Sequence, residues 1–251
     1  MSTPFLKVRG LSKAFGRLRA VDGVSFELAR GEALGVIGPN GSGKSTLINL
    51  ITGFLKPDAG TVEFAGRDIT GIAAHRAVAI GIARSFQLAR PFYRLPVYKN
   101  VVVALASPRS HQQLGSSLGD RDEAALHLLE DVGFERDSAI PTKNAGELPH
   151  GYLKRLELAR CLALAPELLV LDELFSGMSL SEIASVLPLL ERIRAAGTTL
   201  LMVEHRLREL FRVVDRALVL HFGRKIAEGP PREVIANAEV AEAYLGAQVK
   251  G

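Results

Sequence analysis

The residues best suited to chemistry lie together in one glycine-rich stretch near the N-terminus. Glycines in such a stretch let backbone N–H groups turn inward around phosphate oxygens. A lysine at the position of Lys44 reaches β- and γ-phosphates, and a hydroxyl at the position of Ser45 binds Mg²⁺. The stretch therefore predicts a loop that holds the phosphates of a nucleotide, a P-loop. It fits the pattern G-x-x-x-x-G-K-[ST] over Gly38, Pro39, Asn40, Gly41, Ser42, Gly43, Lys44, Ser45 and Thr46.

The segments on either side of this loop are those that such a loop needs. Residues 33–37 form a short apolar run that predicts a buried strand, and residues 47–51 predict a helix. The N-terminus of that helix adds a partial positive charge where phosphate binds. This strand–loop–helix order distinguishes a P-loop from a glycine-rich turn that binds nothing.

Two carboxylates follow a second apolar run. Residues 168–171 are apolar, and Asp172 and Glu173 come directly after them. Mg²⁺ prefers oxygen ligands, so Asp172 is expected to hold it directly or through water. Glu173 is expected to orient or deprotonate an attacking water. The alternative is a strand that ends in two solvated acids, and the P-loop makes that alternative the weaker one.

A histidine follows the next apolar run. His205 comes just after residues 199–203, and ligands of open α/β sheets bind at the carboxyl ends of the strands. We therefore expect His205 to reach a γ-phosphate, although an isolated histidine after a strand is more often structural.

The rest of the sequence predicts the strands and helices that position these segments. Alternating residues at 5–8 and 24–28 predict strands of an antiparallel sheet. From about 88 to 165 the strand patterns fade and helical spacing takes over, which predicts an inserted helical sub-domain with a loop at 107–119. Strands and helices then alternate, which implies a mostly parallel sheet, and a helical tail is predicted over about 230–251. We predict one α/β domain over residues 1–251.

Composition narrows the function further. The chain has 251 residues, of which 47% are hydrophobic and 23% charged, enough for a substantial core. Its 31 Lys and Arg are scattered, so the net charge of +4 favours a solvated surface and no nucleic-acid partner. Neither a secretory signal nor an apolar run of about 18 residues is present, which predicts a cytoplasmic protein. The single cysteine, Cys161, excludes an internal disulfide and is expected to be a buried structural thiol.

The order of these parts resembles the nucleotide-binding subunit of ABC transporters along essentially the whole chain. The resemblance implies an ATPase with a RecA-like core, an antiparallel β sub-domain and a helical sub-domain. It also implies that Phe15 stacks on adenine with Val21 beside it. By the same resemblance Gln87 contacts Mg²⁺ and the attacking water and senses the transmembrane partner, and His205 is the switch histidine.

Four stretches resemble the ATPases of branched-chain amino-acid importers: residues 84–92, 156–162, 228–235 and 243–246. This resemblance implies import, a second ATPase subunit, transmembrane permease subunits, an indirect solute-binding protein, and a peripheral location at the inner face of the membrane. Phe92, Tyr93 and Leu95 are candidates for the permease groove, or they pack locally. The alternatives are a lipid-exporter ATPase and a nucleotide-sensing subunit with weak turnover.

The chain departs from the ABC pattern where one subunit serves its partner's ATP. The usual signature Leu-Ser-Gly-Gly-Gln is replaced by Leu148, Pro149, His150, Gly151 and Tyr152. Pro149 removes a hydroxyl and an N–H, and it is expected at the first helical position.

Two further departures lie downstream. Leu174 replaces a common proline, and Ser179 stands in the D-loop where Asp or Asn is common. We therefore hypothesise an asymmetric pair of ATPase subunits. This subunit has the complete set of residues that contact its own ATP, but a weakened set that contacts the ATP bound by its partner. The partner is then a paralogue rather than a second copy.

Overall fold

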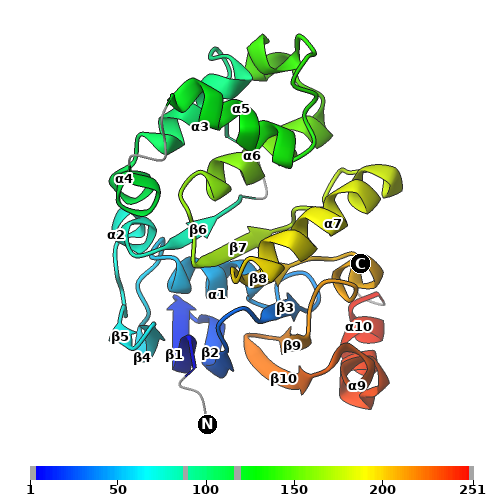
Figure 1. Cartoon of the computed structure of the whole chain (residues 1–251). Coiled ribbons are helices and arrows are strands. Elements are labelled where there is room, and N and C mark those ends of the chain that lie inside the picture. Colours follow the sequence, from blue (N-terminus) through cyan, green and yellow to red (C-terminus); the bar gives the residue numbers. More distant parts are fainter. Residues whose placement is uncertain (1–3, 87–89, 116–119, 249–251) are drawn as a thin grey trace. The chain divides into compact units, whose positions relative to one another are not determined.

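The computed structural model describes residues 4–86, 90–115 and 120–248. The chain divides into two compact units: a first unit of Met1–Ala77 with Gly197–Gly251, and a second unit of Val78–Ala196. Both units combine strands with helices (Figure 1), so the predicted α/β class is confirmed.

The first unit contains an antiparallel sheet in the order β2-β1-β4-β5. Its strands are β1 (Leu6–Phe15), β2 (Leu18–Leu28), β4 (Ala59–Phe64) and β5 (Arg67–Asp68). Along β2 the side chains of Val24, Phe26 and Leu28 are buried and those between them exposed, the alternation expected of a sheet with one covered face. The predicted antiparallel sheet is confirmed, and β1 and β2 are longer than the predicted strands.

The first unit also holds the strand that precedes the P-loop. β3 (Ala33–Ile37) is buried along its whole length and pairs in parallel with β8 (Thr199–Val203) and β9 (Arg216–His221). Burial on both faces explains its unbroken apolar sequence. β10 (Arg224–Gly229) pairs antiparallel with β9. The helices are α1 (Lys44–Ile51), α8 (Leu207–Leu210), α9 (Pro231–Ala236) and α10 (Ala238–Gln248).

The second unit is mainly helical. α3 (Val97–Leu105) packs against α5 (Arg121–Asp131) and α6 (His150–Leu162). α4 (Pro108–Leu114) and two short 3₁₀ turns, Ile140–Thr142 and Ala145–Glu147, lie in the same stretch. β6 (Ile82–Arg84) pairs in parallel with β7 (Leu168–Asp172), and α7 (Leu180–Ala195) follows. α2 (Ala74–Ala79) spans the division between the units.

The predicted loop at 107–119 is wrong in its first half, where α4 stands. The Ser107 side chain accepts a hydrogen bond from the Ser110 N–H and caps the helix, with Pro108 in its first turn. Two polar side chains of this helix, Arg109 and Ser110, are buried. Ser110 Oγ donates to the Ala163 carbonyl at 2.6 Å, and Arg109 donates to the Ala165 carbonyl. These hydrogen bonds join residues that are far apart in the sequence, so composition could not reveal them. The polar composition therefore suggested a loop.

Among residues 4–86, 90–115 and 120–248, no helix is long and apolar enough to cross a bilayer.

Candidate active site

The P-loop connects β3 to α1 and is shaped by backbone contacts that require glycine. Gly38 and Gly43 have φ values of 148° and 105°, conformations that residues with side chains rarely adopt. A Cβ atom on Gly38 would overlap the Leu220 carbonyl oxygen, and one on Gly43 would overlap the Ala20 carbonyl oxygen. The loop is therefore held closely between β2 and the end of β9.

The polar groups of the loop fit a phosphate. Lys44 is buried, and its Nζ donates to the carbonyl oxygens of Gly38 at 2.8 Å and Pro39 at 2.9 Å. Ser42 is only 2% exposed, and its Oγ has no hydrogen-bond partner within the described residues. A buried hydroxyl without a partner is costly, so this one indicates a missing acceptor or donor. Phosphate oxygens beside the Lys44 cation would supply it.

The other predicted residues of the first unit lie on or just after β1, β2 and β8 and at the start of α1. Phe15 ends β1 with 48% of its surface exposed, and Val21 is buried within β2, next to Ala20. Ser45 is exposed at the start of α1, and Thr46 is half-buried. His205 is exposed two residues after the end of β8.

Two C-terminal segments hold the P-loop, and neither was anticipated from the sequence. The Gly223 N–H donates to the Ser42 carbonyl at 3.0 Å from the turn between β9 and β10. Tyr244, on α10, shares a hydrogen bond with the Gly38 backbone. Burial raises the pKa of the Tyr244 phenol, and the Gly38 bond opposes that rise. The resemblance at residues 243–246 was the only sequence signal for this contact.

In the second unit, Asp172 ends β7 in an ion pair. Its Oδ2 lies 2.7 Å from Arg84 Nη2, with the two side chains 5% and 8% exposed. The Asp172 N–H donates to Ser85 Oγ at 3.2 Å. Glu173 follows with a φ of 53°, a strained conformation for a residue with a side chain. Arg84 was not predicted as a partner of Asp172, and Gln87 lies outside the described residues.

The carboxylates do not build a closed metal cage. Among the described residues, no group of three or more His, Cys, Asp or Glu is arranged to hold a metal ion. Mg²⁺ commonly binds through one or two protein oxygens, substrate phosphates and water, so a Mg²⁺ site does not require three protein ligands.

Comparisons with known proteins agree with the fold and the loop. The family model for "ABC transporter" matches residues 21–176, which is more than half of the chain. The chain belongs to the ABC transporter family of ATP-binding proteins. A second model, "Branched-chain amino acid ATP-binding cassette transporter", matches residues 224–250, the segment that includes Tyr244.

Curated ABC relatives are similar over their full lengths. The chain is 33% identical to the high-affinity branched-chain amino acid transport ATP-binding protein BraF of Pseudomonas aeruginosa, covering 98% of this chain and 99% of that protein. It is 35% identical to the corresponding protein LivG of Salmonella typhimurium, with the same coverage. The crystal structure of an ATP-binding cassette of an ABC transporter in its ADP conformation is 33% identical, covers 98% of this chain and 100% of that chain, and has a TM-score of 0.84. The predicted P-loop NTPase fold is confirmed.

In the ABC signature region, helix α6 begins one residue after Pro149, which the sequence placed at the first helical position. α6 starts at His150, and Pro149 is the N-cap with an extended ψ of 156°, not the first helical residue. The fixed φ of proline suits this position, and its missing N–H lies outside the helix. His150 Nε2 lies 3.1 Å from the Ser176 carbonyl oxygen, and a Cβ on Gly177 would lie 2.6 Å from the His150 ring. The histidine thus packs on the D-loop of its own subunit.

Ser179 has a clear structural role in the same unit. It caps α7 in a capping box with Glu182: each residue's side chain accepts from the other's backbone N–H. The Ser179 N–H, as the leading cause, lowers the pKa of Glu182. A Cβ on Gly151 would overlap Glu182 Oε1, so a carboxylate lies against the second residue of α6. Of the other signature residues, Leu148 is buried and Tyr152 packs edge-on against Phe134 at 5.1 Å.

The remaining sequence expectations in this unit concern packing. Leu174, in place of the common proline, is buried. Phe92, Tyr93 and Leu95 are exposed. Cys161 is buried, and burial raises the pKa of its thiol, which makes it inert; the predicted structural thiol is confirmed.

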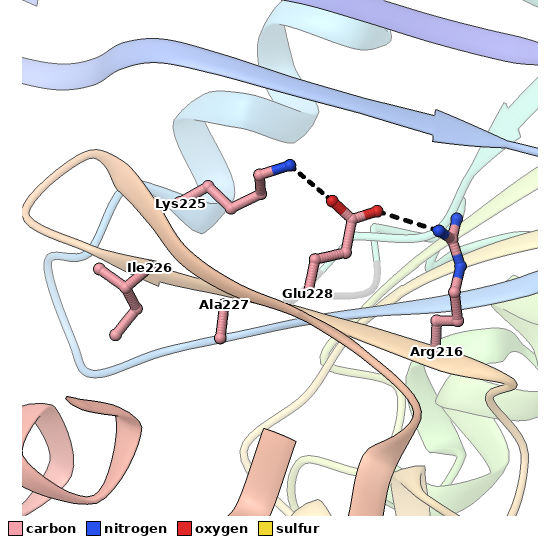
Figure 2. Close-up of a pocket in the computed structure, with 5 residues that line it drawn as sticks. All are labelled: Arg216, Lys225, Ile226, Ala227 and Glu228. Atoms are coloured by element: carbon pink, nitrogen blue, oxygen red, sulfur yellow. Dashed lines mark hydrogen bonds and ion pairs between the residues drawn. The ribbon is translucent and has the colours of Figure 1, made fainter. Parts of the chain in front are cut away.

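A separate pocket of about 460 Å³ lies on β9 and β10 of the first unit (Figure 2). Arg216, Lys225, Ile226, Ala227 and Glu228 line it. Glu228 accepts from both Arg216 and Lys225, and Arg216 also pairs with Glu32. Because its charges are compensated internally, this pocket offers no strong anion site.

Proposed function

We propose that this chain is the ATP-hydrolysing subunit of an importer for branched-chain amino acids or related small solutes. The P-loop carries the nucleotide part of the proposal, because its buried, unpartnered Ser42 hydroxyl beside Lys44 fits a phosphate. The substrate part rests on the relatives, which are named as branched-chain amino acid transport ATP-binding proteins.

Each site residue receives a role from its position in the ABC pattern. Lys44 and the loop amides stabilise negative charge on the β- and γ-phosphates of ATP. Glu173 orients or deprotonates the attacking water. His205 contacts the γ-phosphate, and Gln87 contacts the attacking water. Phe15, half exposed at the end of β1, stacks on adenine.

Mg²⁺ is the metal that this chemistry requires. Ser45, Gln87 and Asp172 are its proposed protein ligands, directly or through water, and a bound ion would neutralise charge on the transferred phosphoryl group. The Arg84 ion pair holds the Asp172 carboxylate in place at the end of β7.

The proposed partners are a second ATPase subunit and transmembrane permease subunits, with a periplasmic or extracellular solute-binding protein acting indirectly. The chain would then lie in the cytoplasm against the inner face of the membrane. We propose that it acts as one ABC ATPase domain, with the helical sub-domain over about 88–165 and the tail over about 230–251.

The second ATPase subunit is proposed to be a paralogue. The start of α6 is the place where an ABC subunit meets the γ-phosphate of its partner's ATP. Here the Glu182 carboxylate lies against Gly151, and His150 packs on Gly177. A carboxylate disfavours a phosphate by like-charge repulsion, so this half-site serves the partner weakly.

The test measures ATP hydrolysis by the purified protein with Mg²⁺, alone and mixed with a candidate partner ATPase and permease. We expect weak activity alone and a strong rise on mixing. Glu173→Gln is expected to trap ATP and reduce turnover by about 100-fold or more, the usual contribution of a general base. Bound ATP with no turnover in any mixture would favour a nucleotide-sensing subunit.

The asymmetry has its own experiment. Glu173→Gln in this chain is compared with the equivalent change in the partner, each in the mixed complex. We expect the larger loss from the change in this chain, and equal losses would contradict the asymmetric pair.

A further inference from the structure

A buried lysine on α6 contacts the segments that follow β6 and β7 in the second unit. Lys154 lies on α6 and is 1% exposed, although an ammonium group is rarely buried without close partners. Its Nζ donates to the carbonyl oxygen of Glu173 at 3.3 Å and to that of Phe86 at 3.3 Å. One side chain therefore contacts both the residue proposed to align water and the residue before Gln87.

A buried glutamate on the same helix completes the arrangement. Glu157 Oε1 accepts a hydrogen bond from the Phe86 N–H at 2.7 Å. Lys154 and Glu157 thus hold the carbonyl and the N–H of one residue, which fixes the orientation of the backbone there. Burial raises the pKa of Glu157, while the Phe86 N–H and the Lys154 charge oppose that rise.

The backbone of Glu173 needs such support. Its φ of 53° is unfavourable for a residue with a side chain, so it persists only where neighbouring groups enforce it. The Glu173 carbonyl accepts from Lys154 and also from the Ser176 N–H at 3.2 Å. Loss of the lysine would leave one of these two restraints.

We propose that Lys154, together with Glu157 on the same helix, is a positioning residue that holds the backbone of Glu173 and of Phe86, the residue before Gln87, in its working orientation. The proposal rests on the proposed roles of Glu173 and Gln87. Lys154 acts through two backbone carbonyls and does not touch the reacting atoms, so it should influence turnover and not nucleotide binding by the P-loop.

The experiment compares Lys154→Met, Lys154→Arg and the double variant Lys154→Met/Glu157→Gln in the full chain mixed with its partner subunits. The double variant removes both charges, so it keeps the test valid if Lys154→Met alone does not fold. Lys143→Met, at an exposed lysine of the same unit, is the control. Steady-state ATP hydrolysis gives kcat and KM separately, and hydrogen–deuterium exchange follows segments 80–86 and 170–176 without requiring activity.

We expect kcat to fall about tenfold, the effect of losing hydrogen bonds to a charged group, with KM within twofold of wild type. Lys154→Arg is expected to restore part of kcat, and exchange in both segments is expected to accelerate in the methionine variants. Unchanged exchange, or a parallel loss in kcat, KM and stability without rescue by arginine, would overturn the proposal. If Glu173→Gln hydrolyses ATP like wild type, the proposed function of Glu173 fails instead, and the exchange result still decides whether Lys154 positions the backbone.

Discussion

The P-loop and the start of α6 are both glycine-containing segments of an ABC ATPase, and they are built in opposite ways. At the P-loop, glycines face backbone carbonyls of β2 and β9, and a buried Ser42 hydroxyl is left for a ligand. At the start of α6, the glycine faces a side chain of the same unit, Glu182, and His150 bonds to the Ser176 carbonyl. The first segment is prepared for an anion, whereas the second is occupied by the protein's own groups.

A match to a motif therefore does not by itself establish a phosphate site. Gly151 matches the ABC signature, yet a carboxylate lies against it. Lys44 matches the P-loop, and its cation is held by two carbonyls that keep it within the loop. The groups around the glycine determine whether phosphate is favoured there. They are carbonyls and a cation at the P-loop, and a carboxylate and an imidazole at the start of α6.

The largest expected effect tests the prepared segment. Lys44→Ala removes the cation and its hydrogen bonds to the phosphates, so we expect ATP affinity to fall about 100-fold or more. Equilibrium binding of ATP to the purified chain measures it. Lys56→Ala, at an exposed lysine of the same unit, should leave the affinity unchanged. Unchanged ATP affinity in Lys44→Ala would contradict the P-loop assignment.

A pair of glycine substitutions tests how tightly the loop is held. Gly41 has a φ of 75° with open space around its Cβ position, whereas the Cβ of residue 43 would meet the Ala20 carbonyl. We expect Gly41→Ala to cost about 1–2 kcal/mol of stability from backbone strain, and Gly43→Ala to cost at least about 3 kcal/mol. Thermal and denaturant unfolding measure both. Equal costs would indicate that the close approach of β2 relaxes readily.

The secondary structure around the two segments was predictable where it depends on runs of consecutive residues. Residues 33–37, 199–203 and the run ending at Asp172 are apolar and bounded by turns, so their strands were predictable. β10 was missed because its residues are mostly charged or small and none is buried, which leaves no apolar pattern to recognise. Pro149 was placed one position too far into its helix because local propensity does not fix a helix boundary.

The contacts that distinguish the two segments were not predictable. Arg84 and Asp172 form their ion pair across 88 positions of sequence, and Lys154 reaches Phe86 across 68. No local spacing encodes such pairings, because they arise from which strands and helices become neighbours. The same holds for His150 with Ser176 and for Tyr244 with Gly38.

Tyr244→Phe gives a smaller effect on the prepared segment. It removes a neutral hydrogen bond to Gly38, worth about 0.5–1.5 kcal/mol, so we expect ATP affinity to fall about 2- to 10-fold. Tyr98→Phe in the second unit is the control. Since the pKa of Tyr244 is raised, the phenol stays protonated at neutral pH, and the loss should be the same at pH 7 and pH 8. An affinity equal to wild type would mean that α10 does not contribute to the loop.

The smallest expected effect tests the occupied segment. In the mixed complex, Glu173→Gln silences the site of this chain, so the residual turnover comes from the ATP that its signature serves. Adding His150→Gly removes the contact to the Ser176 carbonyl and the imidazole beside the first amides of α6, which have no intrahelical acceptor. A released hydrogen bond of about 1 kcal/mol corresponds to a rise of up to about fivefold in that residual turnover. His150→Gln, which keeps a side chain able to bond to the same carbonyl, should give less than half of that rise. If glycine lowers the residual turnover or leaves it unchanged, the histidine contact does not limit the site, and the Glu182 carboxylate against Gly151 becomes the group that separates the two segments.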